Sequence, residues 1–177
     1  MIVFISYLDV STIFINVVQV ESKDMHMPGK TISSIRIPNN SYNDTTHSLL
    51  DYSRYTIVES IEIGDDCYGS VKTFKIEGLN RLRSLRIGKN SFTQVKENEW
   101  NNDYQAAESR VIIGLKSFRI LNCESLESIE IGEYSFSDYG GDFELKNLNA
   151  LQSITVGKIG IKSWNFDIHR SFILRGK

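Results

Sequence analysis

The sequence contains few of the residues that mark several common classes of protein. Its 177 residues include two cysteines, two prolines, three histidines and only three alanines. Alanine is the strongest helix former, so its scarcity disfavours a helical bundle. Two cysteines make no disulfide framework, and neither has a CxxC partner that would indicate a zinc site. The histidines form no HxH or HExxH arrangement, and no GxSxG, P-loop or GxGxxG motif occurs. We therefore expect no catalytic residue, no metal and no cofactor.

Charge and hydropathy argue against two further kinds of partner. Lysine and arginine together number 20 and aspartate and glutamate 22, which gives a net charge of -2. A protein that binds nucleic acid through a broad surface needs an excess of cations. The first 20 residues are apolar, but they lack a basic start and are interrupted by Asp9, Asn16 and Gln19. We expect no nucleic-acid partner and no membrane insertion, and the sequence alone indicates no cellular compartment.

A short apolar motif recurs along the whole chain. Residues 82–88 read Leu-Arg-Ser-Leu-Arg-Ile-Gly, and residues 126–132 read Leu-Glu-Ser-Ile-Glu-Ile-Gly. The six copies begin at residues 10, 32, 58, 82, 126 and 151, and a partial seventh unit starts at residue 172. Ten residues after each start lies an apolar residue: Val20, Tyr42, Tyr68, Phe92, Phe136 and Ile161. Six copies that keep the same internal spacing identify a repeat, although the steps between their starts vary from 22 to 44 residues.

The spacing within one unit predicts strands. Leu85 and Ile87 alternate with polar residues, as the inward side chains of a strand do. Phe74 and Ile76 alternate in the same way before the next copy begins, which predicts a second, shorter strand. One unit cannot bury its apolar side chains alone, but stacked units share a continuous core. We therefore predict a single domain over residues 1–177, a β-rich solenoid with a parallel sheet on one face, short strands on the other and little helix.

Residues 82–92 read LxxLxIxxNxF and resemble the leucine-rich repeat, LxxLxLxxNxL. Residues 117–131, SFRILNCESLESIEI, resemble more specifically the BspA-like subclass, which occurs in surface proteins of bacteria and protists. The resemblance covers about the whole chain. It implies a right-handed solenoid at the cell surface that binds other macromolecules, including in adhesion, without catalysis. The asparagine of the pattern is present only at Asn40 and Asn90, so the other turns need other partners.

The residues between the inward positions form ladders on the solvent face of the main sheet. One ladder alternates in charge and supplies four candidate binding residues, Arg36, Glu62, Arg86 and Glu130. Each pair of opposite charges on neighbouring strands contributes roughly 0.2–1 kcal/mol, less when fully solvated. Serine and glycine ladders lie on either side and predict a smooth face. Either a flat partner approaches this face, or its residues serve twist, solubility and register; we favour the second interpretation.

Two segments of variable length, residues 93–117 and 162–171, are expected to leave one edge of the solenoid. They contain both tryptophans of the chain and four further candidate binding residues, Trp100, Tyr104, Trp164 and Phe166. Tryptophan and tyrosine are enriched at interfaces, and insertions in repeat proteins often form the binding face. In the alternative interpretation, each tryptophan folds back and covers the unit beneath it.

These observations predict a non-catalytic interaction module that binds a protein, with a glycan as the second candidate ligand. Two other functions stay open. The chain is either a structural spacer within a longer repeat array or a degenerate β-solenoid enzyme that acts on glycans. The acids of the main sheet, Glu62 and Glu130, are flanked by arginine along their ladder, which favours a structural role over catalysis. Neither end shows an evident polar cap, so we also expect end-to-end association or continuation into further repeats.

Overall fold

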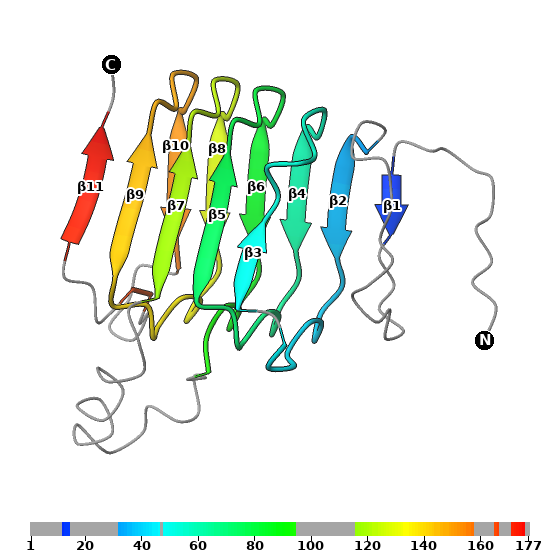
Figure 1. The fold of residues 1–177 in the computed structure, drawn as a ribbon, viewed down its shortest axis with the longest axis vertical. Helices are drawn as coiled ribbons and strands as arrows, with labels where there is room; N and C mark the ends of the chain where they lie inside the picture. The colour runs from blue at the N-terminus through cyan, green and yellow to red at the C-terminus, as the bar shows by residue number, and fades with distance from the viewer. Residues whose placement is uncertain are drawn as a thin grey trace.

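The computed structural model describes residues 12–14, 32–46, 48–94, 116–157, 165–166 and 171–175. Within these ranges the regular secondary structure is entirely β-strand, in two parallel sheets between which the chain alternates. Figure 1 shows the sheets as two layers whose strands run in opposite directions. No helix among the described residues is long and apolar enough to cross a membrane. The predicted parallel sheet, the second set of short strands and the scarcity of helix are thus confirmed.

The first sheet has six strands, which lie side by side in chain order. They are β1 (Thr12–Phe14), β2 (Ser34–Ile37), β4 (Ser60–Ile63), β6 (Ser84–Ile87), β8 (Ser128–Ile131) and β10 (Ser153–Val156). The second sheet has five, also in chain order. They are β3 (Leu49–Asp51), β5 (Thr73–Glu77), β7 (Ser117–Leu121), β9 (Asp142–Lys146) and β11 (Ser171–Arg175).

The register of the first sheet is the one that the repeat predicts. Ser34 lies opposite Ser60, which in turn lies opposite Ser84, and the same serine ladder continues through β8 and β10. A slip of one residue would turn every isoleucine of a strand toward solvent, so burial of one face fixes the register. The inward positions of β2, β4, β6 and β8 are between 1% and 3% exposed: Ile35, Ile37, Ile61, Ile63, Leu85, Ile87, Ile129 and Ile131.

Stacked aromatic rings fill the space between the sheets. One column consists of Tyr42, Tyr68, Phe92, Phe136 and Phe166, with ring centroids between 4.7 and 5.1 Å apart. A second column, Phe74, Phe118 and Phe143, meets the first edge to face. Both arrangements are favoured by the quadrupole of the rings. The aromatic residue of each unit therefore packs mainly on the same residue of the next unit.

The last member of the first column is not the residue that the spacing predicts. The repeat places Ile161 there, a residue outside the described ranges, whereas Phe166 stacks on Phe136 at 5.1 Å. Its unit is thus five residues longer before the aromatic position. A ring continues the stack of rings better than an aliphatic side chain does, and this gain explains the longer connection.

A column of side-chain donors links the turns that follow the first-sheet strands. The donors are the Cys67 thiol, the Ser91 and Ser135 hydroxyls and the Asn165 side-chain amide. Each donates to the carbonyl of the residue that directly follows the first-sheet strand of the preceding unit: Pro38, Gly64, Gly88 and Gly132. We call these four residues the donor column. It satisfies carbonyl groups that the turn buries, as buried polar groups require.

The asparagine position of the repeat is defined by its backbone and not by its side chain. Asn40, Asp66, Asn90 and Tyr134 occupy it in successive units, all with φ between 54° and 61°. Asparagine and aspartate tolerate this left-handed conformation better than most residues, whereas tyrosine does not share that preference. The turns find their partners in the next unit, because the Asn40 and Asp66 amides donate to backbone carbonyls 2.8 Å away. This explains why an incomplete set of asparagines is sufficient.

Candidate binding surface

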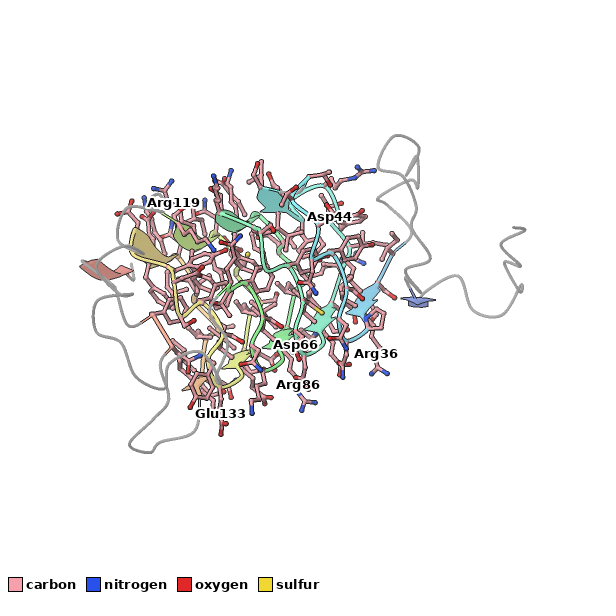
Figure 2. All side chains as sticks on the ribbon, turned by 90° about the horizontal axis from the view of Figure 1, so that it is seen from below. Arg36, Asp44, Asp66, Arg86, Arg119 and Glu133 are labelled. Carbon is pink, nitrogen blue, oxygen red and sulfur yellow. The ribbon has the colours of Figure 1, made fainter. Side chains whose placement is uncertain are left out.

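The charge ladder on the solvent face of the first sheet forms as predicted. The Arg36 guanidinium lies 2.6 Å from the Glu62 carboxylate, and Arg86 lies 4.0 Å from Glu62 and 3.6 Å from Glu130. Figure 2 shows Arg36 and Arg86 projecting from one side of the molecule and Arg119 from the opposite side. The four side chains of the ladder are between 39% and 67% exposed, so water screens each pair. These charges largely cancel and leave little field for attracting a charged partner.

Reversal of one charge tests the ladder. Glu62→Arg would place three cations in a row and is expected to lower the free energy of unfolding by about 0.5–1 kcal/mol at low salt. Urea denaturation at low and at high salt measures the change, which should shrink as salt screens the repulsion. Unchanged stability at low salt would remove these ion pairs from the energetics of the fold.

The glycine ladder beside the charges is required by packing. A Cβ atom on Gly64 would lie 2.7 Å from the backbone nitrogen of Asn39, and one on Gly132 would lie 2.5 Å from the backbone of Gly88. Real Cβ contacts are longer than this, so only glycine permits neighbouring turns to approach so closely. The smoothness of this face thus has a cause within the fold, which supports the structural interpretation of the ladders.

The predicted insertion 93–117 is held at both ends by a buried polar cluster. The Lys116 ammonium donates to Asp138 Oδ2 at 2.7 Å, and these side chains are 2% and 8% exposed. The Thr93 hydroxyl lies 2.6 Å from that of Ser137, and the Gln94 amide donates to the same Asp138 oxygen. Lys116 Nζ also lies 5.3 Å from the centre of the Tyr139 ring, within range of a cation–π contact.

The second insertion returns to the same part of the chain. Asn165 donates to the carbonyls of Gly132 and Ser135, and the Phe166 amide donates to the carbonyl of Phe136. Residues 132–139, which we call the anchor segment, therefore contact both ends of the first insertion and the middle of the second. The common exit of the two insertions from one edge stays a prediction.

The insertions are shorter than the sequence predicts. Ser117 is the first residue of β7, and Thr93 and Lys116 are buried, so the ends of 93–117 belong to the body of the fold. Ser171, the last residue of the predicted segment 162–171, likewise begins β11. In both cases the parallel register extends the strand to a polar residue that the sequence suggests is part of the loop.

The candidate residues of the insertions lie in different surroundings. Trp100, Tyr104 and Trp164 fall outside the described residues. Phe166 is half-buried, with its ring in the aromatic column. Lys116 and Asp138, which sequence reasoning missed, belong to different units, and no local pattern marks two residues that meet only through the stacking of units.

Buried tyrosines form a further polar feature of the core. The Tyr52 and Tyr68 hydroxyls lie 3.1 Å apart, and the Tyr139 hydroxyl donates to the carbonyl of Val71. Burial is the main cause that raises the pKa of Tyr52, Tyr68 and Tyr139 above the ordinary value near 10. All three hydroxyls therefore remain protonated in the folded chain at pH values where exposed tyrosines ionise.

The raised tyrosine pKa values predict instability in alkali. Tyrosines of the unfolded chain lose their protons near pH 10, and the buried ones retain theirs. The contribution of the buried, protonated tyrosines to the free energy of unfolding is thus fully present below about pH 10. Above that pH it falls by about 1.4 kcal/mol per pH unit for each tyrosine. Urea denaturation between about pH 8 and pH 11 should show a shallower decline for Tyr52→Phe than for the original chain. Equal slopes would mean that Tyr52 ionises without unfolding.

The described residues include cysteine thiols and side chains of the kinds that ligate metal ions. No group of three or more His, Cys, Asp or Glu among them is placed to hold a metal ion. Cys67 and Cys123 are buried, and burial raises the pKa of both thiols, which disfavours the reactive thiolate. Comparison with protein-family models, with curated proteins and with solved structures found no match to this chain.

Proposed function

We propose that the chain is a non-catalytic interaction module, a right-handed leucine-rich-repeat solenoid that resembles the BspA-like subclass and binds a protein partner. The anchoring of both insertions on the anchor segment, residues 132–139, is the observation that carries this proposal. Two segments far apart in the sequence would then leave one edge together, as binding loops do on repeat scaffolds. The resemblance would place such a module at the cell surface.

The rigidity of the anchor supports this edge as the binding site. Binding loops work best when a rigid scaffold positions them, because less conformational entropy is lost on binding. Here the ends of the first insertion are fixed by the Lys116–Asp138 ion pair and the Thr93–Ser137 hydrogen bond. The second insertion is fixed by Asn165 and by the stacked ring of Phe166.

Composition also favours this edge over the face of the first sheet. Trp100, Tyr104 and Trp164 are of the kinds that dominate binding energy at interfaces. The arginines of the charge ladder are already paired with glutamates of the same face. A partner that bound there would have to separate or desolvate these pairs, which weakens the net gain.

Selection from a displayed peptide library, followed by comparison of variants, tests the proposal. Peptides selected on the original chain should lose binding when residues 96–114 are replaced by a short Gly-Ser linker, and also in the Trp100→Ala and Trp164→Ala variants. Arg86→Ala is the matched control on the sheet face and should bind as the original chain does. Selected peptides that bind the shortened chain equally well would overturn the assignment to the insertions, and a glycan array probed in parallel separates glycan from protein recognition.

Quenching of tryptophan fluorescence by acrylamide provides an independent check on this proposal. The chain has two tryptophans, so Trp100→Phe and Trp164→Phe each leave a single reporter. Binding rings must reach solvent in the isolated chain, and we expect at least one to be quenched readily. Strong protection of both rings would favour the covering role and contradict the proposed anchors.

A further inference from the structure

The last strand of the first sheet exposes side chains at positions that β2, β4, β6 and β8 bury. Ile154 and Val156 of β10 are 39% and 37% exposed, whereas the residues opposite them in β8, Ile129 and Ile131, are 1% and 2% exposed. The sequence of β10 follows the same pattern as the others, so the difference lies in what covers it. A strand beside β10 would remove both side chains from water.

Among the described residues, no strand pairs with the outer edge of β10. The amides of Ser153 and Gly157 donate to carbonyls of the preceding unit, Glu127 and Ile131. In a parallel ladder the intervening amides, those of Ile154 and Val156, then point away from β8. Unpaired strand edges of this kind accept a strand from another chain.

The two sheets of the described structure do not end at the same level, and a different sheet extends further at each end. At one end the second sheet extends further, because β11 follows β10 and pairs with β9. At the other end the first sheet extends further, since β1 and β2 precede β3, the first described strand of the second sheet. Figure 1 shows β11 and β1 at opposite ends of the molecule. A second copy could therefore place its β1 on β10, beside the projecting β11.

From these features we infer that copies of this chain associate head to tail, with β1 of one copy pairing in parallel with β10 of the next. In the register of the sheet, Ile13 of the second copy would lie beside Ile154, and Phe14 beside Thr155. Both Phe14 and Thr155 end the charge ladder and are uncharged, so the joint brings no like charges together. The contact is independent of the insertions that carry the proposed function.

Sedimentation of the 177-residue chain tests the association. The weight-average mass is expected to at least double as concentration rises a hundredfold, because a head-to-tail contact does not close on itself. The Ile154→Lys and Val156→Lys double variant should stay monomeric with an unchanged far-ultraviolet dichroism spectrum. Glu124→Lys, at an exposed residue outside β1 and β10, changes the net charge by the same amount and is the matched control, which should associate as the original chain does. A monomer at every concentration, or association that persists in the double variant, would overturn the inference.

Cross-linking distinguishes head-to-tail pairing from a two-fold pairing of β10 with β10. A mixture of Thr155→Cys and Phe14→Cys chains, treated with a short bis-maleimide, should give a cross-linked pair that contains one of each. The natural cysteines are buried and serve as the unreactive background, which the original chain measures. Efficient cross-linking of Thr155→Cys chains with one another would show two-fold pairing and overturn the head-to-tail arrangement.

Discussion

Asparagine in place of Asp138 is expected to lower the free energy of unfolding by about 3–5 kcal/mol. The substitution keeps the shape of the side chain and an oxygen for the Gln94 amide, but it leaves the buried Lys116 ammonium without its counter-charge. Removal of one partner from a buried ion pair is more harmful than removal of both, because an isolated charge cannot be solvated. Urea denaturation followed by circular dichroism measures the loss.

The double substitution Lys116→Met with Asp138→Leu separates charge from packing. It removes both charges and retains apolar volume, so it should be more stable than Asp138→Asn alone. If the double variant is less stable than Asp138→Asn, the ion pair itself stabilises the chain and the isolated-charge explanation is wrong. Proteolysis within the first insertion provides a second readout, since weaker anchoring should expose its ends.

Alanine in place of Gly132 is expected to lower the free energy of unfolding by about 3 kcal/mol. The added methyl group would lie 2.5 Å from the carbonyl carbon of Gly88 and 2.6 Å from the Lys89 nitrogen. Both are backbone atoms of the neighbouring turn, so no flexible side chain can yield and the two units must move apart. Thermal and urea denaturation measure the effect, and stability close to that of the original chain would show that adjacent units separate with little cost.

Gly78 provides the matched control for Gly132. It has φ of 71°, and a Cβ atom placed on it would meet nothing within 4 Å. Asn122 and Asn147 occupy the corresponding turn in later units, with φ of 55°. Gly78→Asn should therefore be neutral or stabilise the chain by about 0.5 kcal/mol, because asparagine tolerates this conformation and restricts the unfolded chain. A large loss of stability in Gly78→Asn would mean that the positive φ at this turn requires glycine, even where no neighbouring atom is close.

Sequence patterns predict the part of this fold that repeats. The alternation of Ile61 and Ile63 determines which face of a strand is buried, and the fixed spacing within each motif then sets the register with the neighbouring strands. The charge ladder was predictable for the same reason. Each of its members occupies one position of the repeat, and parallel strands in register bring such positions together.

What could not be predicted depends on contacts that occur once. Phe166, and not Ile161, completes the aromatic column, because a connection longer by five residues allows a phenylalanine ring to stack on Phe136. The spacing of the repeat does not show where these extra residues lie. Lys116 and Asp138 pair across units at a site where the repeat is interrupted. For the candidate binding residues, the sequence indicates the two insertions, and the structure shows that the anchor segment contacts both.

The donor column gives the stack a direction. Each of its side chains donates a hydrogen bond to a backbone carbonyl of the preceding unit. The same unit provides a backbone carbonyl that accepts a hydrogen bond from the next unit. The acceptor at each of these junctions is a backbone carbonyl, so the donor can be a thiol, a hydroxyl or an amide. Gene duplication or loss of a whole unit would therefore preserve this contact. The charge ladder restricts such changes, because loss of the unit that carries Glu62 would bring Arg36 beside Arg86.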